Sequence, residues 1–183
     1  NHEFAYSSVK DTLDKYRHDY EICASFGVKN VHCLDTEGHF DTCGVRFYGN
    51  VLWYDGSLYN GYDGRNYLGK VWEGWLDSSI IGFRPLEEHR KCVEQIKNAQ
   101  SGASGMKQIL VTHCVPHRKL NMFDIETPMS IANCYSGVDN LFDAYHIYPD
   151  VSLCGHTHRR VLYEHRFDGG SILCYNSGND YFF

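Results

Sequence analysis

The chain has 183 residues, of which 43% are hydrophobic and 15% aromatic, and its formal net charge at pH 7 is −6. This length suits one domain or part of a larger one, and the apolar content exceeds that of disordered chains. No apolar run reaches the roughly 18 residues that a membrane-spanning helix needs. The acidic balance disfavours a dedicated nucleic-acid-binding protein. Composition therefore excludes the disordered, fibrous and membrane-spanning classes.

A helix is predicted over residues 8–24 by the spacing of its apolar residues. Five of them recur at helical intervals and form one stripe: Val9, Leu13, Tyr16, Tyr20 and Cys23. Ser8 and Asp11 resemble a capping box at the start of this segment, and Gly27 follows its end.

The next segments mix strand, loop and helix signals. A short strand is expected at residues 31–34, and residues 46–54 carry the aromatic and β-branched residues typical of strands. Residues 55–70, rich in Gly, Tyr, Asn and Asp, indicate a long loop. A second helix is predicted over 85–99, because Pro85 suits a first turn and acidic residues follow it. Its buried face is expected to consist of Leu86, Val93 and Ile96.

The second half of the chain continues this alternation and ends in a hairpin. Short apolar runs predict buried strands over 108–112 and 151–154, with a third helix over 138–148 between them. Asp168-Gly169-Gly170 predicts a tight turn between two final strands. We therefore expect an α/β fold whose sheet has antiparallel additions at its end.

The eight cysteines show no C-x-x-C spacing, which excludes zinc-finger and thioredoxin-like proteins. An even count permits a disulfide framework, but a chain of this length with a real core does not need one. We expect buried, reduced thiols and a cytoplasmic protein.

Two histidine-containing groups stand at the carboxyl ends of predicted strands, where open α/β sheets place their sites. His113 ends the strand 108–112, and His156 and His158 follow the strand 151–154 within Gly155-His-Thr-His. On an extended segment, imidazoles at i and i+2 project the same way, so each can bind one of two metal ions about 3.5–4 Å apart. An exposed loop without a metal explains the same residues, and the spacing alone leaves both possibilities open.

A third group, Asn1-His2-Glu3, precedes the first helix. An Asn amide oxygen is a neutral metal ligand, and a neighbouring histidine can supply a proton while an acidic residue orients it. Alone this triplet predicts nothing, because terminal residues are usually frayed.

In this order, the segments NHE, VTHCVPH and CGHTH resemble the motifs of the calcineurin-like metallophosphoesterases. That family has GNH(D/E), then a lone strand-end histidine, then GH-x-H. The resemblance runs from residue 1 to the hairpin after His158. It implies an α/β fold in which a sandwich of β-sheets is flanked by helices. It also implies hydrolysis of a phosphate monoester or diester by two divalent metal ions, and such ligands suit Mn, Fe or Zn.

The resemblance assigns roles position by position. The implied metal ligands are Asn1, His113 and His156 for one ion and His158 for the other. His2 resembles the histidine that acts as general acid or stabilises the leaving oxygen, and Glu3 the acidic residue that holds it. The segment departs from the family's HHPP form at Cys114, so no role follows for Cys114 or His117.

Two family motifs that precede GNH, D-x-H and GD-x-x-D, are absent from the sequence. They would supply the aspartate that bridges both ions. We therefore expect residues 1–183 to be the carboxyl-terminal portion of a single metallophosphoesterase domain, with weak metal binding and no appreciable hydrolysis by itself. We also expect the sheet to lack its amino-terminal strands and to leave an apolar edge bare.

Two alternatives belong to other classes. A catalytically inactive phosphoesterase-like scaffold would bind partners, although such scaffolds lose site histidines that this chain retains. A structural Cys/His metal module would need a tetrahedral spacing that the sequence lacks. The expected partner is a phosphoester substrate and not a membrane. Basic residues at 117–119 and 158–160 could hold phosphates, but the net charge makes nucleic acid the less favoured substrate.

Overall fold

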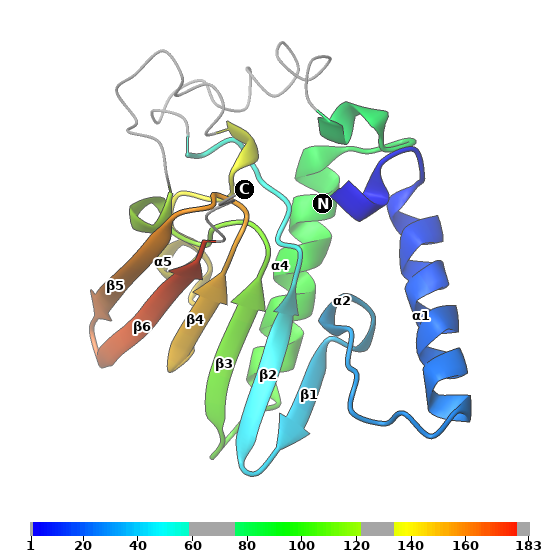
Figure 1. The fold of residues 1–183 in the computed structure, drawn as a ribbon. Helices are drawn as coiled ribbons and strands as arrows, with labels where there is room; N and C mark the ends of the chain where they lie inside the picture. The colour runs from blue at the N-terminus through cyan, green and yellow to red at the C-terminus, as the bar shows by residue number, and fades with distance from the viewer. Residues whose placement is uncertain (1, 59–75, 122–133, 179–183) are drawn as a thin grey trace.

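The computed structural model describes residues 2–58, 76–121 and 134–178, whose strands form one six-stranded sheet (Figure 1). The strands are β1 (His39–Thr42), β2 (Val45–Asn50), β3 (Lys107–Thr112), β4 (Val151–Cys154), β5 (Arg160–Phe167) and β6 (Gly170–Ser177). Their order across the sheet is β1-β2-β3-β4-β6-β5. The four central strands run parallel, and the edge strands β1 and β5 are antiparallel to their neighbours. The α/β class with antiparallel additions and the final hairpin are confirmed.

The described helices are η1 (His2–Phe4), α1 (Val9–Ser25), α2 (Leu34–Glu37), η3 (Leu76–Ser79), α4 (Pro85–Ser101), η4 (Arg118–Leu120) and α5 (Leu141–Tyr145). Figure 1 shows α4 and α5 behind the sheet, with α1 standing beyond the β1 edge. None of these helices is long and apolar enough to span a membrane.

Local signals account for the two long helices. The Ser8 hydroxyl accepts the N–H of Asp11 at 3.0 Å and caps α1, and Pro85 occupies the first turn of α4. Val93 and Ile96 are buried as predicted, but Leu86 is 41% exposed. Leu86 lies in the first turn of α4, the end that extends beyond the strands in Figure 1, so the sheet does not cover it.

The predicted strand at 31–34 is wrong, because these residues lead into the single turn of α2. The Glu37 carboxylate accepts the backbone N–H of Cys33 at 2.8 Å, and the Cys33 carbonyl accepts the N–H of Glu37 at 2.9 Å. These reciprocal bonds close a helical turn in place of a strand. The loop predicted over 55–70 lies outside the described residues except for 55–58.

The third predicted helix, 138–148, shrinks to the five residues of α5. The start of the predicted helix forms a hydrogen bond with another segment instead, because the N–H of Val138 donates to the carbonyl of Val115 at 3.0 Å. The helix begins instead after Asn140, whose side chain accepts the N–H of Asp143. It ends at His146, which adopts the left-handed conformation with φ 57°.

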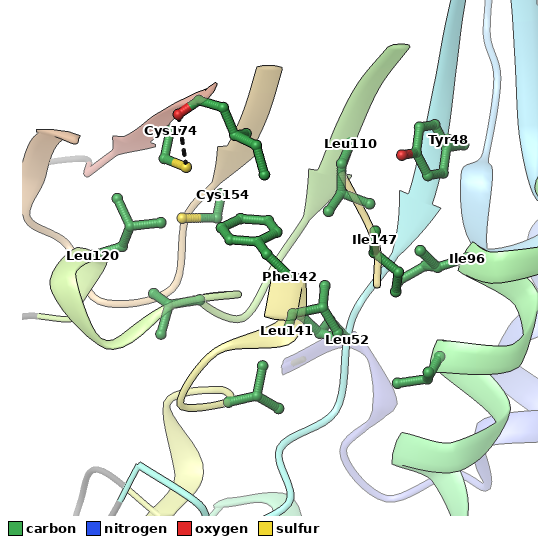
Figure 2. Packing of buried hydrophobic residues seen from close by; sticks show 14 of the residues in the cluster. Tyr48, Leu52, Ile96, Leu110, Leu120, Leu141, Phe142, Ile147, Cys154 and Cys174 are labelled. Atoms are coloured by element: carbon green, nitrogen blue, oxygen red, sulfur yellow. Dashed lines mark hydrogen bonds between the residues drawn. The ribbon is translucent and has the colours of Figure 1, made fainter. Parts of the chain in front are cut away.

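One face of the sheet packs on α4 and α5 and forms the larger core. Figure 2 shows side chains from several elements meeting there, among them Tyr48 from β2, Leu110 from β3, Cys154 from β4, Cys174 from β6, Ile96 from α4 and Phe142 from α5. No disulfide joins any of the eight cysteines, all of which are described. Five cysteines are buried, Cys23 and Cys33 are half-buried, and Cys43 is exposed. Burial raises the pKa of the Cys92 and Cys174 thiols to about 12.

The opposite face is also apolar, yet no helix or strand of the described ranges covers it (Figure 1). In-register neighbours form two apolar rows across it: Phe47, Ile109, Val151 and Leu173, then Val111, Leu153, Tyr175 and Leu162. Leu162 is 69% exposed and Leu173 47%. The expected sandwich is therefore not formed by the described residues, whose strands all join one sheet. Apolar exposure therefore falls on one face of the sheet and includes Leu162 on the edge strand β5.

Candidate functional site

The carboxyl ends of the parallel strands open onto a cavity of about 700 Å³. Its walls come from the ends of β2, β3 and β6, the loop after β4, and parts of η1, α1 and α2. Four residues singled out from the sequence line it: Glu3, His113, His156 and His158. The cavity thus lies where open α/β sheets bind their ligands.

Two of these histidines face each other across neighbouring parallel strands. Nδ1 of His156 lies 3.1 Å from Nε2 of His113, and the ring centroids are 4.8 Å apart. Nε2 of His156 lies 3.0 Å from the backbone oxygen of Tyr135 and donates its proton to it, since a carbonyl can only accept. In the neutral ring, this hydrogen bond leaves Nδ1 of His156 unprotonated and turned toward Nε2 of His113, which can then donate a proton to it.

The arrangement of the two imidazoles is compatible with both of them binding one metal ion as part of its coordination shell. A histidine bound to a metal commonly offers one ring nitrogen to the ion and donates the other N–H to a carbonyl, as His156 does to Tyr135. Since zinc–nitrogen bonds measure about 2.0–2.1 Å, nitrogens 3.1 Å apart can contact the same ion. A larger set does not form, because no group of three His, Cys, Asp or Glu side chains in the described ranges is placed to hold an ion.

The sequence pattern predicted an extended segment for the loop that carries His156 and His158. The structure shows a turn instead. Both histidines are left-handed, with φ of 65° and 52°. Such a conformation costs about 1–3 kcal/mol for a residue other than glycine and is characteristic of functional sites. At His156 it arises because the N–H of Thr157 turns back onto the carbonyl of Gly155 at 2.8 Å, while the N–H of Gly155 bonds to the carbonyl of His113. His158 is exposed but still lines the cavity.

The amino-terminal triplet reaches the same cavity through η1. Phe4 is buried and packs edge-on against Trp53, with ring centroids 5.3 Å apart, which fixes η1 beside the strand ends. Glu3 is exposed at the rim of the cavity. Asn1 lies outside the described residues, and His2 is described by its backbone alone. The roles assigned to Asn1 and His2 therefore stay predictions.

Cys114 and His117 do not line the cavity. Cys114 is fully buried, which raises the pKa of its thiol. His117 lies under α5, stacked on Tyr163 at 5.0 Å, and burial, reinforced by the neighbouring His165, lowers its pKa to about 4. In the basic segment 117–119, His117 is therefore uncharged near neutral pH.

The lining residues that sequence reasoning did not assign to the site include Tyr16, His32, Cys33, Asp35 and Asn50. Asp35 accepts the N–H of Val51 at 2.9 Å, and burial raises the pKa of its carboxyl although this bond opposes the shift. Asn50 donates to the carbonyl of Cys92 at 3.0 Å and so ties the end of β2 to α4. Asn50 could have been noticed, because it ends β2 just as His113 follows β3.

Comparison with known proteins adds little to this geometry. No protein-family model matches the chain, and no curated protein matches it. Among solved structures, the chain is similar to the crystal structure of phosphopantetheinyl hydrolase (PptH) from Mycobacterium tuberculosis, with a TM-score of 0.49 and 17% sequence identity. The match covers 89% of this chain, which spans 61% of the length of that structure. A likeness of this strength assigns neither a family nor an activity.

Proposed function

We propose that this chain belongs to a metal-dependent phosphoester hydrolase of the calcineurin-like type, which cleaves a phosphate monoester or diester. The observation that carries this proposal is the His113–His156 pair, whose facing nitrogens are 3.1 Å apart at the carboxyl ends of adjacent parallel strands. His158 and Glu3 support it, because they line the same cavity. The order of the NHE, VTHCVPH and CGHTH segments supports it independently.

In this proposal each side chain has a defined task. The metal ligands would be Asn1, His113 and His156 for one divalent ion and His158 for the other, with Mn, Fe or Zn favoured by imidazole. When bound, the two ions would supply positive charge that polarises the phosphoryl oxygens and lowers the pKa of a water molecule. His2 would protonate or hydrogen-bond the leaving oxygen, and Glu3 would orient that imidazole. The carbonyl of Tyr135 would keep His156 in the tautomer that binding requires.

We also propose that residues 1–183 form the carboxyl-terminal portion of a single domain of this type. The open sheet face supports this, because parallel sheets are normally covered on both faces. The missing carboxylates of D-x-H and GD-x-x-D point the same way. We therefore expect this chain to bind metal weakly and to hydrolyse phosphoesters poorly without the rest of the site.

Isothermal titration of the chain with Mn²⁺ or Zn²⁺ tests the metal centre. His156→Ala should weaken binding at least about 10-fold, because it removes a ligand that the Tyr135 carbonyl preorients. His18→Ala is the matched control, since His18 is exposed on α1 away from the cavity. Equal affinities in wild type and His156→Ala would contradict the assignment.

Hydrolysis of bis(4-nitrophenyl) phosphate with Mn²⁺ tests the partial-domain proposal. A longer protein that carries D-x-H and GD-x-x-D should turn over, and the present chain should not. Turnover by the present chain that His156→Ala abolishes would overturn the partial-domain proposal while supporting the phosphoesterase.

The absence of D-x-H and GD-x-x-D from the sequence also fits a second candidate, a phosphoesterase-like scaffold that binds partners without catalysis. A longer protein that binds two metal ions per chain but hydrolyses no member of a phosphoester panel would support the scaffold over the enzyme.

A further inference from the structure

Asn176, near the end of β6, is fully buried, and its side-chain amide is saturated with hydrogen bonds. Nδ2 donates to the carbonyl of Leu120 at 2.8 Å and to the hydroxyl of Thr157 at 2.6 Å. Oδ1 accepts the N–H of Gly178 at 3.3 Å. Both amide hydrogens and the amide oxygen are therefore used, which fixes one orientation of this side chain.

Thr157 is the residue between the two left-handed histidines, and it is buried. Its hydroxyl accepts from Asn176 and donates to the carbonyl of Leu120 at 3.3 Å. Residues other than glycine hold a left-handed conformation only where their surroundings fix it. Because Thr157 is anchored at its hydroxyl by β6 and η4, it can fix both neighbours.

The end of β6 touches this loop at a second point. A Cβ added to Gly178 would lie 2.3 Å from the carbonyl carbon of Arg159, so only glycine permits this approach. In addition, Cys154 pairs with Asn176 in the parallel ladder of β4 and β6. The last residue before the loop is thus already beside Asn176.

We propose that Asn176 is a positioning residue for the candidate metal centre. Through Thr157 it holds the His156–His158 loop in the conformation that directs Nδ1 of His156 at Nε2 of His113. Asn176 does not line the cavity, so it acts through the loop and not on a ligand. The purpose of this arrangement rests on the proposed function, but the arrangement itself can be tested without a metal.

Nuclear magnetic resonance of the metal-free chain, labelled with ¹⁵N in its histidine rings, tests the arrangement. Wild-type His156 should show a single tautomer protonated at Nε2. Asn176→Ala and Thr157→Val both remove the bond between these side chains and should give mixed tautomers at His156. Thr157→Ser keeps the hydroxyl and should give the wild-type signals. Cys174→Ala is the packing control, because Cys174 is fully buried on the same face of β6, two positions earlier.

A Zn²⁺ competition assay against a chromogenic chelator adds a second measurement. Asn176→Ala and Thr157→Val should each weaken Zn²⁺ binding roughly 10–100-fold, whereas Cys174→Ala and Thr157→Ser should stay within about threefold of wild type. The double variant of Asn176 and Thr157 should lose little more than either single variant, because both remove the same bond.

Unchanged His156 signals in folded Asn176→Ala and Thr157→Val would overturn the inference, as would an equal disturbance in Cys174→Ala. If Asn176→Ala does not fold, the contrast between Thr157→Val and Thr157→Ser decides. If wild type binds no Zn²⁺, the proposed function fails, while the tautomer comparison still decides the role of Asn176.

Discussion

Both faces of the sheet carry apolar residues, but they differ in what covers them. Leu110 on β3 is fully buried beneath the helices, whereas Leu153 on the adjacent β4 points to the open face and is half-buried. Parallel strands with apolar residues on both faces are typical of sheets covered on both sides. The covered face therefore contains the main packed core of the described residues, whereas the open face has the composition of an interface.

Substituting these two leucines gives the largest expected contrast. Leu110→Ala should lower the free energy of unfolding by about 2–5 kcal/mol, because it opens a cavity in a packed core. Leu153→Ala should cost about 1 kcal/mol or less, because its side chain is only half-buried. Urea denaturation measures both. Equal losses would mean that the open face is packed as tightly as the covered one.

Acid should weaken the covered face through His117. Its pKa is about 4 in the folded chain, against an ordinary value of 6.5. The neutral ring is favoured in the fold, so its contribution is complete above pH 6.5 and is lost as the pH falls toward 4. The loss should approach roughly 3 kcal/mol. Urea denaturation between pH 7 and pH 4 measures it.

His117→Phe keeps an aromatic ring against Tyr163 and should flatten this part of the pH profile. Leu153→Ala, on the other face, should keep the full wild-type slope. An unchanged slope in His117→Phe would show that other groups govern the acid response.

The smallest effect on stability is expected at the exposed rim of the open face. Leu162→Lys should change the free energy of unfolding by about 0.5 kcal/mol or less, because Leu162 is 69% exposed. It should nevertheless reduce the binding of an apolar fluorescent dye and any concentration-dependent self-association, both of which report exposed apolar surface. A loss of several kcal/mol would place Leu162 in a packed environment and contradict the description of an open face.

The sequence predicted best those elements that local chemistry controls. Ser8 caps α1 and Pro85 starts α4 as expected, because capping depends on neighbours in the chain. The predictions were wrong where hydrogen bonds between segments far apart in the chain determine the local structure. Val138 bonds to Val115 and not within a helix. The sandwich was implied by resemblance alone, and no periodicity within these strands can specify what covers their second face.

The candidate site shows the same division. The apolar runs before His113 and His156 were enough to place both residues at strand ends, whereas the structure shows that the two strands are parallel neighbours. The left-handed loop was not foreseen, since its backbone bonds depend on the carbonyl of His113. Asn176 was missed because its role exists only once β6 lies beside β4.

β6 is the last of the described strands to be synthesised. It enters the sheet between β4 and β5, although it follows both in the chain. On the ribosome, His113 and His156 therefore emerge before the strand that secures their loop. A nascent or prematurely terminated chain that stops short of Asn176 would carry both imidazoles without their anchor. The assembly of this histidine pair is thereby coupled to the synthesis of the last strand that the structure describes.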